Sequence, residues 1–107
     1  MATTPTLMYR GTLSTTTTTQ LYAGAASGTA IVTNIALTNI TSSAATATIN
    51  LQTGGTAVPI LSAVTIPANS TAFFDVKQVL SGTSNAITGG AGTASAIDAH
   101  ISGVVIV

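Results

Sequence analysis

Alternation of apolar and polar residues runs through most of this 107-residue chain. The clearest stretch is ATATINLQ, residues 45–52, in which the odd-numbered residues are apolar and the even-numbered ones are Thr, Asn or Gln. A period of two residues is typical of a strand with one buried face. We therefore predict a half-buried antiparallel strand here.

Three further runs alternate in a similar way. In TAIVTNIALTNI, residues 29–40, Ile31, Ile35 and Leu37 are expected to share one face of a strand. The opposite face is also partly apolar, which favours a central strand or one covered by a partner. In STAFFDVKQV, residues 70–79, the pattern places Phe73 opposite the inward face.

The C-terminal run SAIDAHISGVVIV completes the set. Ile97, Ala99 and Ile101 are expected to point inward, whereas Asp98 and His100 are expected to point outward. Gly103 is expected to mark a bulge, and the run beyond it is apolar on both faces. Such an uncharged tail is prone to aggregate when exposed, so we expect it to be paired.

Short turn-forming stretches separate these runs. Gly54-Gly55 predicts a tight hairpin, and the glycine-rich stretch 88–93 predicts a loop. Pro59 indicates that the strand containing it is an edge strand or an irregular one, because proline has no backbone N–H to donate. Only VKQVLSG, residues 76–82, has a pattern compatible with a helical turn. We predict an all-β fold, a small antiparallel β-sandwich that is jelly-roll-like, with about seven or eight short strands. Their ranges are roughly 6–13, 16–22, 29–40, 44–52, 57–64, 70–77, 84–88 and 94–106.

The run of threonines at Thr15–Thr19 can be interpreted as a linker, a glycosylated stalk or folded structure. Threonine is β-branched and favours strands, and the run leads directly into Leu21-Tyr22. A mucin-like stalk would contain proline among its threonines. We therefore predict that the run begins a strand.

Charged residues make up only 4% of the chain, against about 25% in ordinary soluble proteins, and the formal net charge is zero. A soluble monomer usually keeps a charged surface to avoid association. We therefore expect other protein to cover much of this surface. The mean hydropathy of +0.61 argues against a disordered chain. We expect one domain over residues 1–107, with a short N-terminal arm at about residues 1–8.

Residues that could carry chemistry are few. The chain has no cysteine, and its one histidine, His100, shares a strand face with Asp98, while the other carboxylate is Asp75. A metal site needs three or four ligands, and a nucleophile elbow is missing. We therefore expect no enzyme activity, no cofactor and no metal. Nucleic acid would need a basic patch, and a membrane span about 20 apolar residues, so neither is an expected partner.

One block of the sequence consists of TTQLYAGAASGTAIVTNIALTNITSSAATATINL, then VTIPANSTAFFDV, then a loop of small residues, then AHISGVVIV. This block resembles small virion proteins of tailed bacteriophages. The resemblance spans roughly residues 17–107 and carries no catalytic motif. A proline expected near Ala25 or Ala26 is missing from the turn.

The resemblance implies a structural role in a virion. It points to a capsid decoration, or cement, protein that binds the major capsid protein and stabilises the head, often as a homotrimer. The implied location is the capsid surface, after synthesis in the bacterial host cytoplasm. Two alternatives stay open: an adaptor of the tail, neck or fibre, and a host- or glycan-binding module displayed on the virion.

We expect contacts between subunits at the N-terminal arm, at an outward aromatic residue and in the apolar tail. The residues concerned are Thr3, Thr4, Pro5, Leu7, Phe73, Val105 and Val107.

Overall fold

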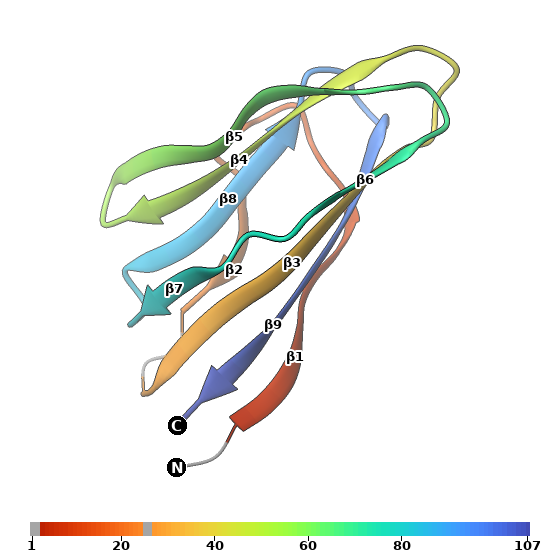
Figure 1. The fold of residues 1–107 in the computed structure, drawn as a ribbon. Coiled ribbons are helices and arrows are strands. Elements are labelled where there is room, and N and C mark those ends of the chain that lie inside the picture. The colour runs from red at the N-terminus through yellow and green to blue at the C-terminus, as the bar shows by residue number, and fades with distance from the viewer. Residues whose placement is uncertain (1–2, 25–26) are drawn as a thin grey trace.

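The computed structural model describes residues 3–24 and 27–107, and these residues form nine strands in two antiparallel sheets (Figure 1). The five-stranded sheet has the order β1-β9-β3-β6, with β7 also paired to β3, and the four-stranded sheet has the order β2-β8-β4-β5. The strands are β1 (Thr3–Thr12), β2 (Gln20–Ala23), β3 (Thr29–Asn39), β4 (Ala45–Thr53), β5 (Thr56–Ile66), β6 (Thr71–Phe74), β7 (Gln78–Ser81), β8 (Asn85–Ala91) and β9 (Ile97–Ile106).

This strand order is that of a jelly roll. Both β6 and β7 pair with β3, so together they act as one interrupted strand and bring the effective count to eight. The chain moves back and forth between the two sheets, and the first and last strands lie next to each other. The prediction of a small antiparallel, jelly-roll-like sandwich is confirmed.

Several strand boundaries differ from the predicted ones. The stretch 76–82 contains β7 instead of a helical turn, and the strand predicted at 70–77 ends at Phe74. Strand β8 continues to Ala91, so Gly89 and Gly90 lie within a strand where a loop was expected. Glycine suits both positions because a Cβ there would press on neighbouring backbone.

The expected N-terminal arm is also corrected. Residues 3–8 form the first part of β1 and pair with the C-terminal part of β9, from Thr3 opposite Ile106 to Leu7 opposite Ser102. Met1 and Ala2 lie outside the described residues. The partner of this segment is therefore the chain's own last strand, so Thr3 lies beside the C-terminal end of β9 (Figure 1).

The core lies between the two sheets and is mostly aliphatic. Ile35 and Ile101 enter it from the five-stranded sheet, and Ile49 and Ile87 enter it from the four-stranded sheet; all four are fully buried. The period-two prediction holds for β4 and β9, where alternate residues point inward. Tyr9 packs at the margin of the core rather than at its centre.

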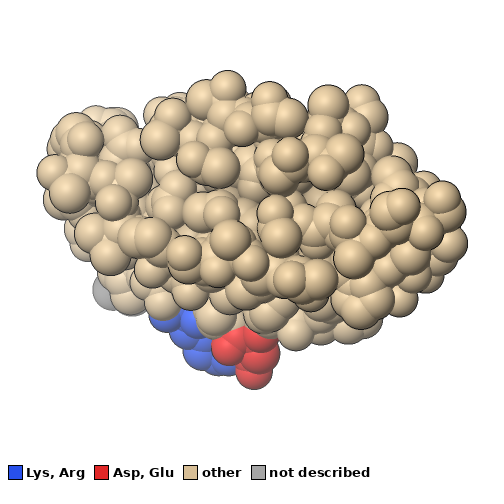
Figure 2. Space-filling model, turned by 90° about the horizontal axis from the view of Figure 1, so that it is seen from above, with Lys and Arg blue, Asp and Glu red and all other residues tan. Residues whose placement is uncertain are grey.

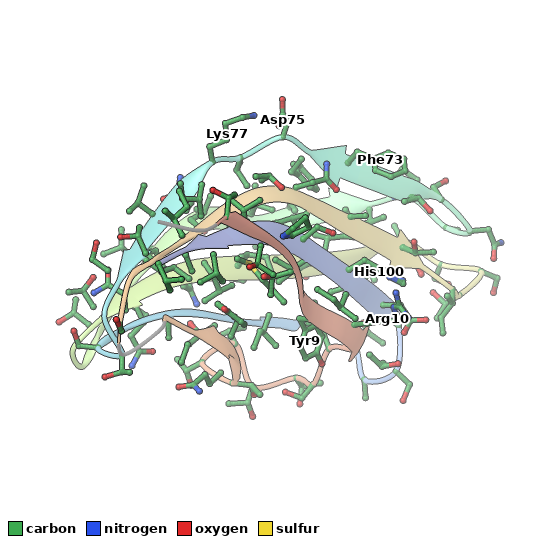
Figure 3. All side chains as sticks on the ribbon, turned by 90° about the horizontal axis from the view of Figure 1, so that it is seen from below. Tyr9, Arg10, Phe73, Asp75, Lys77 and His100 are labelled. Atoms are coloured by element: carbon green, nitrogen blue, oxygen red, sulfur yellow. The ribbon has the colours of Figure 1, made fainter. Side chains whose placement is uncertain are left out.

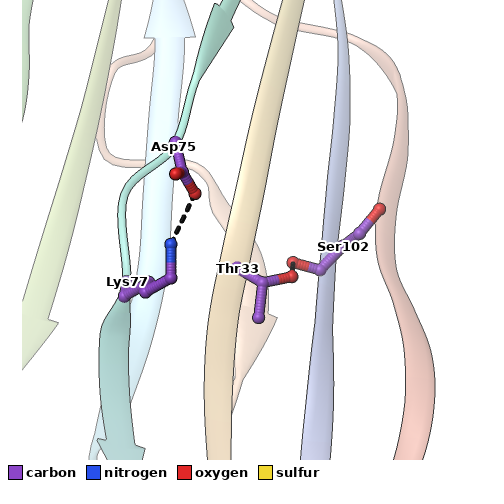
Figure 4. Close-up of polar contacts among 4 residues, drawn as sticks. All are labelled: Thr33, Asp75, Lys77 and Ser102. Carbon is purple, nitrogen blue, oxygen red and sulfur yellow. Dashed lines mark hydrogen bonds and ion pairs between the residues drawn. The ribbon is translucent and has the colours of Figure 1, made fainter.

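A register shift changes the face of β3 halfway along the strand. The ladder between β3 and β9 slips between Val32 and Asn34, so Thr33 is an extra residue, and its hydroxyl donates to the Ser102 carbonyl at 3.2 Å (Figure 4). Before this bulge the inward residues are even-numbered, and after it they are odd-numbered. Ile31 therefore points away from the core while Ile35 points into it, which corrects the prediction that they share a face.

Gly103 lies between two such bulges. Its neighbours in the sheet are Thr6 and Val32, and the extra residues are Met8 in β1 and Thr33 in β3. The bulge expected at Gly103 is thus present, but in the flanking strands. The methionine side chain is buried against this glycine, at the place where a Cβ would stand.

We predict that Gly103→Ala destabilises the sandwich. The added Cβ would overlap the Ile31 carbonyl oxygen and the Met8 thioether, and the backbone of a central strand cannot rotate away. Overpacking of this kind lowers the free energy of unfolding by about 1–3 kcal/mol. Urea unfolding followed by circular dichroism measures the loss.

The matched control is Gly55→Ala in the β4–β5 hairpin, where an added Cβ meets nothing within 4 Å. A loss in Gly103→Ala no larger than the loss in this control would contradict the prediction.

Candidate functional site

The surface of the sandwich offers few concave or ligating features. Within residues 3–24 and 27–107 there is no pocket and no group of three His, Cys, Asp or Glu residues able to hold a metal ion. No helix in that part of the chain is long and apolar enough to cross a membrane. The features that suggest binding lie instead on one broad sheet face.

The other broad face, on the four-stranded sheet, is partly covered by the chain itself. Residues 14–19 connect β1 to β2 and lie along β8 on this face of the sheet. The Ala91 amide donates to the Ser14 carbonyl at 2.8 Å, and the Gly89 amide donates to the Thr19 carbonyl at 3.0 Å. The strand predicted to begin in the threonine run is therefore wrong, because β2 begins at Gln20.

Asn50 holds this threonine segment on the sheet. Its side-chain amide donates to the Thr17 carbonyl at 2.9 Å and to the Thr88 hydroxyl at 3.3 Å. Although Asn50 alternates onto the outer side of β4, it is only 4% exposed because the segment lies over it. Gly90 leaves room for the carbonyl groups of the segment, since a Cβ there would stand 2.6 Å from the Thr16 oxygen.

The outer face of the five-stranded sheet is open and is organised in rows that run across the strands. One row is apolar from edge to edge, because Pro5 pairs with Val104, Val104 with Ile31, and Ile31 with Val79. Leu7, in the next row, is 56% exposed, and Val79 is 54% exposed. Contiguous apolar side chains on a surface mark an interaction site more often than scattered ones do.

A second row contains aromatic and ionisable side chains. Arg10 pairs with His100, His100 with Ala36, and Ala36 with Phe73. Phe73 is 73% exposed, the highest value among the large exposed apolar residues (Figure 3). The neighbouring row runs from Thr12 through Asp98 and Thr38 to Thr71.

The charged residues of the chain gather on this same side. Asp75 and Lys77 lie in the connection between β6 and β7, where the chain leaves β3, and they form an exposed ion pair at 2.6 Å (Figures 3 and 4). Asp98 accepts a 2.6 Å hydrogen bond from the Thr12 hydroxyl. Seen from above, the charged atoms in view meet at one margin of an otherwise uncharged surface (Figure 2). With two Lys or Arg and two Asp residues, the outer face carries no net charge.

The edges of both sheets are unsuited to adding another strand. Strand β1 carries Pro5 and a bulge, and β5 carries Pro59 and two register shifts, with Ala63 at a φ of 46°. Strand β2 has four residues, and the edge formed by β6 and β7 is interrupted. The prediction that Pro59 lies in an edge or irregular strand is confirmed, because β5 is an edge strand and is also irregular. Features of this kind discourage edge-to-edge pairing, so contacts through sheet faces are favoured.

The residues predicted for subunit contacts separate into groups. Pro5, Leu7 and Phe73 lie on the outer face of the five-stranded sheet, as does Thr3, which pairs with Ile106. Thr4 and Val105 pair with each other on the opposite side of that sheet, and Val105 packs against the core. Val107 follows β9 and is exposed.

Sequence reasoning missed three members of the apolar row, which are Ile31, Val79 and Val104. Ile31 was expected to share a face with Ile35 and Leu37, and Val79 fell in the stretch compatible with a helical turn. Val104 could have been predicted, because the residues after Gly103 are apolar on both faces of the strand and one of those faces has to point outward.

Comparisons with known proteins found little similarity. No family model matches the chain, and no curated protein matches it. Among solved structures, the chain is similar to a chain in the structure of infectious bursal disease virus, Gx strain, with a TM-score of 0.45 and 14% sequence identity. The match covers 97% of this chain but 30% of the viral chain, so this chain spans less than a third of that chain's length.

We predict that Asn50→Ala loosens the threonine segment. Loss of the two donated hydrogen bonds is expected to lower the free energy of unfolding by about 1–2 kcal/mol. Hydrogen exchange of the Gly89 and Ala91 amides should become faster, because both donate to carbonyl groups of this segment.

Gln52→Ala is the control, since Gln52 lies on the same side of β4 and bonds only to the nearby Gly54 carbonyl. Equal exchange of the two amides in both variants would show that Asn50 does not hold the segment.

Proposed function

We propose that this protein is a virion structural protein of a tailed bacteriophage. Its most specific role would be that of a capsid decoration protein, which binds the lattice of the major capsid protein and stabilises the head. The observation that carries the proposal is the open apolar row across the outer face, on a domain with zero net charge. Such a surface suits permanent contact with other protein, whether another copy of this chain or a different virion protein.

The chemistry of the surface supports an assembly role rather than a catalytic one. Asp75 is exposed and forms an ion pair with Lys77, and half-buried Asp98 accepts a hydrogen bond from the Thr12 hydroxyl. Neither carboxylate lies in a pocket. Contacts through uncharged surfaces require little desolvation of charge. Repetition of a modest contact over a symmetric lattice lets many weak interfaces act together.

The resemblance to phage virion proteins supports the same role. It adds the capsid surface as location, synthesis in the bacterial host cytoplasm, and a homotrimer as the assembled form. All three remain predictions. A jelly-roll sandwich is compatible with them but does not determine function, because this fold occurs in viral capsid proteins, lectins and cupins alike.

The number of copies in each particle tests the proposal. A decoration protein that follows the capsid lattice should be present in hundreds of copies, on the order of the capsid subunits. An adaptor of the tail or neck should instead be present in about 6 to 12 copies, as ring symmetry requires. Quantitative mass spectrometry of purified particles, with the major capsid protein as internal standard, measures this ratio.

Particles that lack the protein provide a test of stabilisation. They are expected to release their genome at a lower temperature and after milder osmotic shock than complete particles, because the contacts between capsid subunits have been lost. Dye binding to released DNA during heating measures the transition. Restoring the purified protein to the same particles is the control, and an unchanged release temperature would argue against a cement role.

A further inference from the structure

We propose that the outer face of the five-stranded sheet is a self-association surface whose occupant is a second copy of this chain. The two copies pack face to face about a two-fold axis that runs parallel to the strands and passes between β9 and β3. Sheets stacked in this way lie about 10 Å apart. The inference does not rest on the proposed virion role, because it follows from the strand register, the charge and the accessibility of this face. It predicts a dimer where the resemblance implies a homotrimer. It assigns the apolar row to contact between copies, so a capsid would be bound by the remaining surface of the dimer.

The apolar row is self-complementary under this symmetry. A two-fold axis between β9 and β3 reverses the order of each row, so that each edge residue meets the opposite edge of the other copy. Pro5 then faces Val79 of the second copy, and Val104 faces Ile31. All four contacts in the row are apolar, as the core of a stable interface requires.

The row that contains Arg10 and His100 also forms acceptable contacts when it faces the same row of the second copy in reverse order. Arg10 faces Phe73 of the second copy, and His100 faces Ala36. A guanidinium over an aromatic ring is a favourable contact. Asp98 faces Thr38 of the second copy, so no two like charges oppose each other in these rows.

The row between them places Leu7 against the β6–β7 connection of the second copy. The Asp75–Lys77 pair in that connection has no net charge, and the aliphatic stem of the lysine can cover the leucine. Repulsion is therefore avoided here as well.

Charge and accessibility together select a second copy as the occupant. The face contains both signs of charge in equal number, so it does not attract a strongly charged partner such as a nucleic acid. The sheet edges are interrupted, and the threonine segment covers part of the other broad face. A net-neutral face that matches its own reverse is the property of an isologous interface.

The first test uses cysteine cross-linking, which is clean because the chain has no cysteine. A further row runs from Thr3 through Ile106 and Thr29 to Ser81, on the side of the apolar row away from Leu7. Thr3 and Ser81 lie at opposite edges of the sheet, so the symmetry brings Thr3 of one copy over Ser81 of the other. Thr3→Cys and Ser81→Cys are co-expressed and treated with a bismaleimide shorter than about 10 Å, the sheet spacing.

A cross-linked dimer is expected from the mixture and not from either variant alone. Two copies of residue 3 lie at opposite edges of the stacked sheets, about 14 Å apart across the strands, in addition to the sheet spacing. Cross-linking of either single variant to itself, or none in the mixture, would overturn the two-fold arrangement.

The second test compares two exposed valines by light scattering after size exclusion. Val79→Asp places a charge in the apolar row and is expected to weaken the dimer by about 100-fold, because the carboxylate would be buried without a partner. Val58→Asp is the matched control: Val58 is 60% exposed on β5 of the other sheet and should leave the dimer intact.

The unmodified protein is expected to have the mass of a dimer in both this measurement and native mass spectrometry. A monomer at 100 µM, a homotrimer, or equal effects of the two aspartate variants would overturn the inference. Circular dichroism of both variants shows whether they are folded; if Val79→Asp is not, the cross-linking result decides the question. Copy number in particles is independent of these outcomes, so failure here leaves the decoration role to its own test.

Discussion

Strand β9 lies between β1 and β3, and its two ladders of backbone hydrogen bonds join the N-terminal segment to the middle of the chain. Its inward residues, among them Ile101, contribute to the core, while its outward residues, among them His100 and Val104, form the middle of the outer face. Gly103 allows the bulges in β1 and β3 on either side of β9, because it leaves room for the buried Met8 side chain. The arrangement of the outer face therefore depends on how this one strand pairs.

A chain with so few charges has to avoid uncontrolled association by means of its backbone. Proline and bulges interrupt β1 and β5, and the Asp75–Lys77 connection interrupts the edge made by β6 and β7. The threonine segment covers part of the four-stranded sheet, tied down by Asn50. These features leave one broad face for specific contact, and its register makes that face complementary to itself.

Local sequence pattern predicted much of the fold. Strands appear where residues alternate regularly, as in β4 and β9, and the hairpin at Gly54-Gly55 and the edge strand at Pro59 follow from turn and proline chemistry. Phe73 was expected outward from alternation alone and is outward. The threonine run was misjudged because the strand preference of threonine competes with a hydrogen-bonded loop that only the neighbouring strands β4 and β8 make possible.

The sequence by itself determined the strand content, the scarcity of charge and the inward set of each regular strand, because these depend on residue type and a period of two. Tertiary structure decided which face Ile31 occupies, that Val79 belongs to a strand, and that Arg10 and Phe73 end the same row. A bulge moves the register by one residue and so reverses every side chain beyond it. Where a bulge forms depends on strands that are distant in sequence, such as β1 and β3 on either side of Gly103, and no local pattern records that pairing.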